Sequence, residues 1–371
     1  MSLDARTPEI HVLLPHAEGF GPGHAGAIAL GVRDVTRISR YRARTTVFGR
    51  PVEPAFDGAG FVPLEPAWPR LLGRNRGLAE AYRRRLAGRR DVLVELHNRP
   101  VMASWLTRLA PGLPLTMRLA NDPLSTRDLS HARARRHLLK RMRAIYCVSE
   151  FVRRRFLEGV GSDPDKLHVV HNGIVKAPGR PVGKDTLILY VGRVVPGKGV
   201  DHLIEALGTV LPRHPAWRAE IIGASRPGAV SRSPLEETLR AQAAPLGERI
   251  RWLSFMPNDQ VLERYRRAAI SVVPSVMAEA LSRTSAEGLA NGCAVIGYAS
   301  GGIPEVLRDR GVLLDDKTPA RLADALDELI RNDALRERLQ ERAWSSFPFT
   351  IEAMAEGYDR VRERLLAEIG R

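Results

Sequence analysis

The stretch TLILYVGRVVPGKG, residues 186–199, decides the fold of the second half of the chain. Its first six residues are a short β-branched and aliphatic run, which predicts a buried strand. The run breaks into a glycine-rich turn that carries Arg193 and Lys198, and a helical pattern follows from residue 200. This order is typical of a parallel α/β sheet. Two cations on a turn at the end of a strand indicate a diphosphate ligand.

The same alternation of strand and helix extends in both directions from this stretch. Later strands are expected at residues 219–222, 250–255, 270–273, 294–298 and 311–314. Earlier strands are expected at residues 10–14, 45–48, 91–96, 115–119, 144–148 and 167–170. Helical patterns fill most of the intervals, for instance at residues 202–210, 236–244, 258–268 and 320–331. The pattern predicts parallel sheets with crossover helices.

A chain of 371 residues is too long for one ordinary core and fits two domains. The segment KAPGRPVGKD, residues 176–185, has the composition of a linker between them. We therefore expect one Rossmann-like domain over residues 1–175 and a second over residues 176–350, facing each other across a ligand cleft. The last helical segment, residues 351–371, is expected to pack back on the first domain.

A second polar segment follows the expected strand at residues 270–273. It reads PSVMAEALSRTSAE, residues 274–287, and its small hydroxyl residues Ser282, Thr284 and Ser285 open a helix. Free amides at a helix start favour an anion. Glu279 and Glu287 flank this start, and carboxylates suit sugar hydroxyls better than phosphate. The end of the expected strand at residues 250–255 could flank a base through Phe255 and Met256.

These segments resemble the donor-binding half of GT-B glycosyltransferases of family 4. The resemblance rests on GRVVPGKGVDHLIEAL (192–207), the Glu279-x7-Glu287 spacing and GLANGCAVIGYASGGIPEVL (288–307). It implies that Arg193 and Lys198 bind the nucleotide diphosphate, that Glu279 contacts the donor sugar and that Glu287 holds the ribose. The other donor-binding residues that it implies are Phe255, Met256, Leu281, Ser282, Arg283 and Thr284. Ser282 and Thr284 stand where the family has glycine and an aliphatic residue.

The resemblance implies a retaining transfer of a hexose from a UDP- or GDP-sugar to a glycan or a lipid-linked acceptor. Arg193, Lys198 and Glu279 are the catalytic residues expected in this half. Neither a metal nor another cofactor is expected, because the chain has no Asp-x-Asp at a strand end and no His/Cys pair at ligand spacing.

The first half carries a glycine turn, EGFGPGHAGA, at residues 18–27. Gly21 and Gly23 are expected beside the donor phosphates, and His24 beside the acceptor. The turn is also a literal G-x-G-x-x-G through Gly26, so an NADPH-dependent oxidoreductase is an alternative. It starts seven residues after the expected strand, whereas a dinucleotide turn starts at the strand end.

Polar residues follow other strands of the first half. The segments LVELHNRP (93–100), MRLANDP (117–123), YCVSEFVRRRF (146–156) and HVVHNGI (168–174) resemble rhizobial-type lipopolysaccharide-core and exopolysaccharide transferases of family 4. Many members carry a catalytic histidine where this chain has Ala120, and His97, one strand earlier, is the expected replacement. The remaining acceptor-binding residues expected are Asn98, Asn121 and Asp122.

The charge is unevenly distributed along the chain. Of a net charge of +15, residues 1–175 carry +13, and two arginine-rich clusters lie at 70–90 and 127–143. Such a surface favours an anionic membrane, a phosphate-bearing lipid or nucleic acid. A nucleic-acid-binding protein is the second alternative, although these clusters lack interleaved aromatic residues.

Residues 1–19 contain no apolar stretch long enough for a signal peptide, and no run of the chain could span a bilayer. Two cysteines give no disulfide framework. We therefore expect a cytoplasmic protein, peripheral at the inner face of the membrane.

Overall fold

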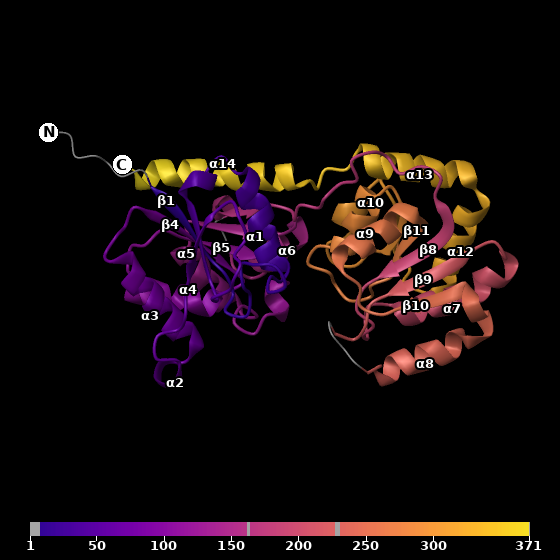
Figure 1. The fold of residues 1–371 in the computed structure, drawn as a ribbon, viewed down its shortest axis with the longest axis horizontal. Helices are drawn as coiled ribbons and strands as arrows, with labels where there is room; N and C mark the ends of the chain where they lie inside the picture. The colour runs from indigo at the N-terminus through magenta and orange to yellow at the C-terminus, as the bar shows by residue number, and fades with distance from the viewer. Residues whose placement is uncertain (1–7, 162–163, 227–230, 371) are drawn as a thin grey trace. The chain divides into compact units, whose positions relative to one another are not determined.

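The computed structural model describes residues 8–161, 164–226 and 231–370, which fold into two α/β units (Figure 1). Unit 1 comprises the chain up to Gly173 together with the segment from Ile351 onward, and unit 2 comprises Ile174–Thr350. Each unit is built on one parallel sheet covered by helices. The prediction of two Rossmann-like domains is confirmed.

Unit 1 contains a seven-stranded parallel sheet in the order β3-β2-β1-β4-β5-β6-β7. The strands are β1 (Glu9–Leu13), β2 (Thr45–Gly49), β3 (Gly60–Pro63), β4 (Val92–His97), β5 (Leu115–Leu119), β6 (Ala144–Cys147) and β7 (Leu167–Val169). Strand β3 was not predicted from the sequence. This strand has four residues, begins with glycine, ends with proline and lies partly exposed at the sheet edge, so it lacks the apolar run of a buried strand.

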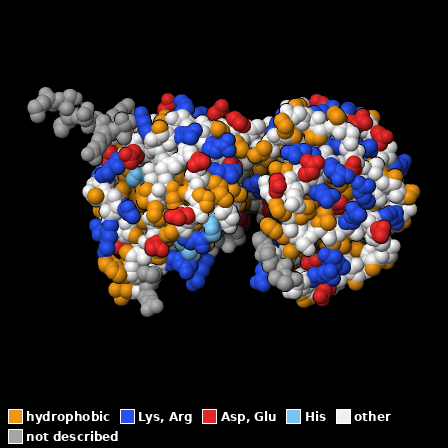
Figure 2. All heavy atoms as spheres, in the orientation of Figure 1, with side chains coloured by type: hydrophobic (Ala, Val, Ile, Leu, Met, Phe, Trp, Pro, Cys, Tyr) orange, Lys and Arg blue, Asp and Glu red, His pale blue; other side chains and the backbone are white. Residues whose placement is uncertain are grey.

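Two groups of helices cover this sheet. The helices are α1 (Ala27–Ile38), α2 (Pro69–Leu72), α3 (Arg74–Leu86), α4 (Pro100–Leu109), α5 (Ala132–Arg141), α6 (Glu150–Leu157) and α14 (Ile351–Ile369). Helices α3 to α6 pack in series, whereas α14 packs on α1 and β4. Figure 2 shows basic side chains along the flank of unit 1 where Figure 1 draws α3. Val12, Val32 and Tyr358 share one buried cluster, so the C-terminal helix completes the core of unit 1.

A buried ion pair fixes α14 to the middle strand of this sheet. Arg362 donates to both carboxylate oxygens of Glu95, at 2.9 and 2.7 Å, and both residues are only 2% exposed. Asp359, one turn earlier, accepts hydrogen bonds from the Ser39 hydroxyl at 2.6 Å and from the Arg40 amide at 2.8 Å. A bidentate guanidinium–carboxylate pair fixes geometry as well as charge. The register of α14 on unit 1 is therefore set by polar contacts inside an apolar core.

Unit 2 contains a six-stranded parallel sheet in the order β10-β9-β8-β11-β12-β13. The strands are β8 (Asp185–Val191), β9 (Arg218–Ile222), β10 (Ile250–Leu253), β11 (Ala268–Val273), β12 (Ala294–Tyr298) and β13 (Val312–Leu314). The helices are α7 (Val200–Val210), α8 (Pro234–Ala243), α9 (Asn258–Arg267), α10 (Arg283–Ala290), α11 (Ile303–Leu307), α12 (Pro319–Arg331) and α13 (Asp333–Ser345).

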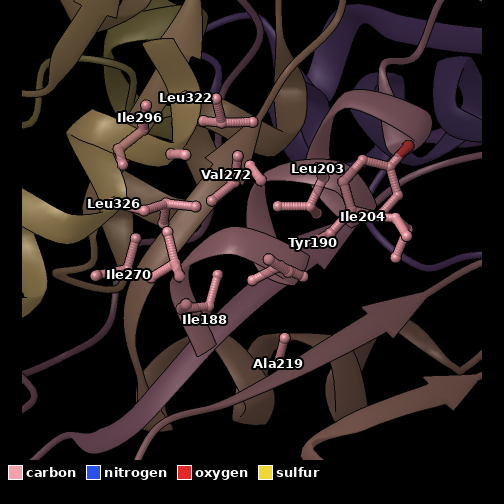
Figure 3. Packing of buried hydrophobic residues seen from close by; sticks show 14 of the residues in the cluster. Ile188, Tyr190, Leu203, Ile204, Ala219, Ile270, Val272, Ile296, Leu322 and Leu326 are labelled. Carbon is pink, nitrogen blue, oxygen red and sulfur yellow. The ribbon is translucent and has the colours of Figure 1, made fainter. Parts of the chain in front are cut away.

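Strand β8 is buried on both faces, as its continuous apolar sequence predicts. Ile188 and Tyr190 point into one core with Leu203 of α7 and Leu326 of α12 (Figure 3), and the alternate residues of β8 enter the core on the other face. None of the described helices is long and apolar enough to cross a membrane.

Replacing Arg362 by methionine should lower the free energy of unfolding by about 3–5 kcal/mol, because it leaves the Glu95 carboxylate buried without its partner. Urea denaturation compared with the wild type measures the change. Arg266→Ala is the matched control, since Arg266 forms an exposed pair with Glu263 and should contribute less than about 1 kcal/mol. Equal effects of the two substitutions would contradict the anchoring role of Arg362.

Candidate functional site

A cavity of about 320 Å³ opens in unit 2 at the carboxyl ends of β8, β9 and β10, beside the start of α10. Strand order reverses between β8 and β11, and ligands of open α/β sheets bind at such a point. The walls are mostly apolar, with several charged groups among them. The lining residues are Val191, Gly192, Arg193, Ile222, Gly223, Ala224, Arg226, Phe255, Met256, Asn258, Val261, Arg283 and Glu287.

Two glycines of the turn after β8 bring it against the loop after β11. Gly199 has φ +69°, and a Cβ there would lie 1.8 Å from the carbonyl oxygen of Pro274. The amides of Val276 and Met277 both donate to the carbonyl of Gly197, at 2.9 and 3.0 Å. A side chain at residue 199 would push the two segments apart. The glycines therefore hold Lys198 on one segment close to Glu279 on the other.

Lys198 and Glu279 form an ion pair, with both side chains about one fifth exposed. The Glu279 backbone is fixed from a third segment, because its carbonyl accepts a hydrogen bond from the Gly302 amide at 2.7 Å. A Cβ on Gly301, which has φ +59°, would lie 2.2 Å from the same carbonyl oxygen. The turn at residues 301–302 thus positions the backbone of Glu279, and Lys198 orients its carboxylate.

The start of α10 offers backbone amides rather than a row of hydroxyls. Ser282 is the N-cap, and its hydroxyl accepts the Ser285 amide at 3.3 Å and lies 2.7 Å from the Ser285 hydroxyl. The helix starts where the sequence predicted, with Ser282 as its cap, and both serine hydroxyls are buried at this start. The amides of Arg283 and Thr284 have no acceptor among the described residues and are available to an anion. Leu281, just before the cap, packs against the core of unit 2.

Glu287 lies one turn into α10, on the cavity wall, and is 4% exposed. Burial raises the pKa of its carboxyl, and Arg283 lowers it in part by charge and hydrogen bonding. The Arg283 guanidinium donates to Glu287 at 2.7 Å. This pairing was not predicted from the sequence, because a spacing of four residues does not reveal which side chains face a cavity.

Arg193 and Arg226 add two more guanidinium groups to the cavity lining. Arg193 was predicted from its place in the glycine-rich turn. Arg226 and Asn258 were not, because Arg226 lies in a loop, Asn258 begins α9, and neither belongs to a distinguishing sequence pattern. Phe255 is 61% exposed at the rim, beside Met256 on the wall. An exposed aromatic ring next to an apolar wall can stack on a planar ligand group.

The predicted residue His97 lies in unit 1, at the end of β4, whereas the cavity just described belongs to unit 2. It is 5% exposed and lines a separate cavity of about 80 Å³ with Arg118, Asn172 and Arg362. Burial and, to a smaller extent, the charges of Arg118 and Arg362 together lower the pKa of His97 to about 3. The imidazole is therefore neutral near neutral pH.

Two of the expected acceptor-binding residues have local structural partners. The Asn98 side chain accepts a hydrogen bond from the Ala120 amide at 2.9 Å, and Asn98 itself has φ +51°. Asp122 accepts the Leu124 amide at 3.0 Å and forms an ion pair with Arg155 at 3.2 Å.

The other two expected acceptor-binding residues lie nearer the surface of unit 1. Asn121 is exposed, and the His24 ring lies 3.3 Å from the Arg50 guanidinium. Asn121 and His24 are therefore more accessible to a ligand than Asn98 and Asp122.

The glycine turn at residues 18–27 does not offer a dinucleotide site. The Glu18 carboxylate accepts the Ala29 amide at the start of α1 at 2.7 Å. A Cβ on Gly26 would lie 2.7 Å from the same carboxyl group, so this glycine makes room for Glu18. Gly21 lies against the carbonyl of Pro54, and Gly23 adopts φ +74°. A carboxylate in the place of the pyrophosphate disfavours the NADPH alternative, since the two would repel each other.

No group of three or more His, Cys, Asp or Glu side chains is placed to hold a metal ion within residues 8–161, 164–226 and 231–370. Cys147 and Cys293 are buried free thiols.

Replacing Arg283 by methionine should destabilise unit 2 in a pH-dependent way. The raised pKa of Glu287 means that its contribution to stability is present at low pH and is lost as pH rises through the folded-state pKa. Without Arg283 the loss of folding stability with rising pH should become larger and reach about 1–3 kcal/mol near neutral pH. Thermal unfolding between pH 5 and pH 8 measures it. Glu287→Gln in the same background should abolish the added pH dependence; its persistence would show that another group titrates.

Two family profiles match the chain. The profile described as Glycosyltransferase Family 4 matches residues 34–176, and that described as Glycosyl transferases group 1 matches residues 175–345. A D-inositol 3-phosphate glycosyltransferase of Acidothermus cellulolyticus is 30% identical over 233 residues, which cover 58% of this chain and 52% of that protein. The chain thus spans about half the length of this curated relative.

Solved structures share the fold across nearly the whole chain. The Anabaena protein Alr3699/HepE in complex with UDP has a TM-score of 0.74 at 18% identity, covering 97% of this chain and all of that one. The lipopolysaccharide outer core galactosyltransferase WaaB has a TM-score of 0.73 at 13% identity, covering 96% and 99% of the two chains. The chain belongs to the group 1 and family 4 glycosyltransferases, and its fold is GT-B.

Proposed function

We propose that this family 4 glycosyltransferase moves a hexose from a UDP-sugar to an acceptor hydroxyl, with retention of configuration, in the synthesis of a cell-surface polysaccharide. The observation that carries the proposal is a cavity in unit 2 lined by Arg193 and Glu287, with the Lys198–Glu279 ion pair joining the turn that carries Arg193 to the loop before α10. A structural neighbour, Alr3699/HepE, was solved with UDP and with UDP-glucose, which supports this donor. A GDP-sugar is the other donor to assay.

Each charged group at the site suits one part of the donor. Arg193 and the two free amides of α10 would hold the diphosphate, with Lys198 beside them. Glu287 would accept hydrogen bonds from the ribose hydroxyls, and Phe255 would flank the base together with Met256. Glu279, oriented by Lys198, would accept from hydroxyls of the sugar.

The difficult step is the departure of the diphosphate. As the bond between the anomeric carbon and the phosphate oxygen breaks, the electron pair stays on the diphosphate, where negative charge develops. Lys198, paired with Glu279, and the α10 amides are fixed by the fold before the reaction, so they can stabilise this charge without reorganising, and Arg193 on the cavity wall adds a second cation. No protein nucleophile is required by this scheme. His97 is buried and neutral in unit 1, and its catalytic role stays a prediction.

For the acceptor we propose a glycan or a lipid-linked sugar, met at the cytoplasmic face of the membrane. Exopolysaccharide and lipopolysaccharide enzymes among the related proteins favour this class. The relative of 30% identity is named for D-inositol 3-phosphate, so a soluble phosphorylated polyol is the acceptor to assay beside glycans.

Thermal unfolding with added nucleotides tests the donor site. UDP should stabilise the protein by about 2.7 kcal/mol at a hundredfold excess over its dissociation constant, whereas NADPH should not. Alanine at Arg193 or Lys198 should each weaken UDP binding by about 1.5–3 kcal/mol, because charged hydrogen bonds are lost. Calorimetry measures both, with the exposed Arg338→Ala as the control. Stabilisation by NADPH alone, or unchanged UDP affinity in both site variants, would overturn the proposal.

Transfer should also be metal-independent, since protein cations and amides can neutralise the leaving group. Activity measured as release of UDP should be unchanged in excess EDTA. A loss of activity that manganese or magnesium restores would show that a metal ion supplies part of this charge.

A further inference from the structure

We propose that the outer surface of α3, α4 and α5, together with the tip at Trp68 and Leu71, docks on an anionic lipid surface. This deepens the proposed function, because it would bring the enzyme to a lipid-linked acceptor. The binding itself can be measured without donor or acceptor.

The three helices carry almost only positive charge. There are five lysines and arginines in α3, one in α4 and five in α5. The single carboxylate of the three helices is Glu80. They pack side by side in the order α3, α4, α5. An excess of one sign on neighbouring helices produces a positive potential that extends into solvent.

Some of these cations already have hydrogen-bond or ion-pair partners within the protein. Arg135 is buried and donates to the carbonyl groups of four residues, Leu129, Ser130, Phe156 and Glu158. Arg83 and Arg84 both pair with Glu80. These three arginines are explained by local structure and need no external partner.

A second group of basic residues has no such explanation. Arg108, Arg133, His137, Lys140 and Arg141 gather where α4 meets α5, and we call them the α4–α5 basic cluster. Partial burial lowers the pKa of His137, and the charges of the other four members lower it further. The Nη1 atom of Arg141 is buried without a hydrogen-bond partner. No described carboxylate lies within ion-pair distance of the cluster.

The cluster continues toward α3 through one aromatic ring. The guanidinium groups of Arg76 and Arg108 lie 5.0 and 5.3 Å from the centre of the Trp105 ring. Arg76 belongs to α3 and Arg108 to α4, so the indole connects the charges of the two helices. The positive surface is therefore continuous across the three helices.

An apolar tip adjoins this surface. Leu71 is 82% exposed and Trp68 is 55% exposed, with the guanidinium of Arg84 4.1 Å from the centre of the Trp68 ring. Figure 2 shows hydrophobic side chains at the tip that Figure 1 labels α2. Charge alone would suit any polyanion. Exposed leucine and tryptophan beside arginines suit the boundary between headgroups and acyl chains, which favours a lipid surface.

Cosedimentation with vesicles tests the proposal. The protein should bind vesicles containing phosphatidylglycerol at low ionic strength, bind phosphatidylcholine vesicles weakly, and dissociate as salt screens the surface charges. Arg133→Gln with Lys140→Gln should reduce partitioning about 25-fold, because each cation near an anionic leaflet contributes about fivefold. Leu71→Ser should weaken vesicle binding, and the size of this loss should depend little on salt concentration.

A matched control is Arg321→Gln with Arg338→Gln, which removes two exposed arginines from unit 2 and should leave binding unchanged. Circular dichroism and thermal unfolding would verify that each variant is folded. The proposal is overturned if the protein fails to sediment with anionic vesicles at low salt, or if the cluster and control variants bind equally. It is also overturned if Leu71→Ser has no effect while the protein binds heparin more tightly than vesicles, since the surface would then be a polyanion site. UDP binding is measured separately, so either proposal can fail alone.

Discussion

The pair between Arg362 and Glu95 joins the last helix of the chain to the middle strand of the first sheet, in the interior of unit 1. Its consequence is topological. The chain leaves unit 1 after β7, builds all of unit 2 and must return to place α14. The two connecting segments pair at Ile174 and Thr350, with the Ile174 amide donating to the Phe349 carbonyl at 2.8 Å. Unit 2 is therefore tied at both of its ends, and an apolar helix face alone would not fix the register of that return.

Within unit 2 the corresponding constraint is close backbone approach. Gly199 and Gly301 each occupy a position where a Cβ would collide with a carbonyl oxygen of a neighbouring loop. The loops after β8, β11 and β12 can meet only because these residues have no side chain. Their meeting fixes Lys198 and Glu279, so charged groups from distant parts of the sequence become one rigid site. Fixed donors and acceptors of this kind stabilise a developing charge at little reorganisation cost.

Much of this could be predicted from the sequence, because the strands are apolar runs and the charges lie at their ends. The glycine-rich turn after β8 and the Glu279–Glu287 spacing indicated the cavity that the structure places there. The family resemblance, rather than the spacing, supplied the roles of these residues. What could not be predicted were pairings between side chains, such as Arg283 with Glu287 and Glu18 with the start of α1. These depend on rotamers and on loop paths, which periodicity does not encode. The edge strand β3 was missed for the opposite reason, since its partial exposure leaves no apolar run to detect.

The arginine content shows why net charge alone is a weak argument for a partner. The chain has 57 lysines and arginines, and those that the structure describes differ in what their charged groups already bind. Arg118, Arg135 and Arg362 are buried, and their guanidinium groups donate hydrogen bonds to carbonyl, hydroxyl, amide or carboxylate oxygens. A planar guanidinium with five N–H donors is well suited to such a set of acceptors. Such residues raise the net charge of unit 1 without adding to an exposed basic surface. A docking surface must instead be sought where cations crowd one another without a carboxylate nearby, because holding like charges together costs free energy and an external anion offsets that cost.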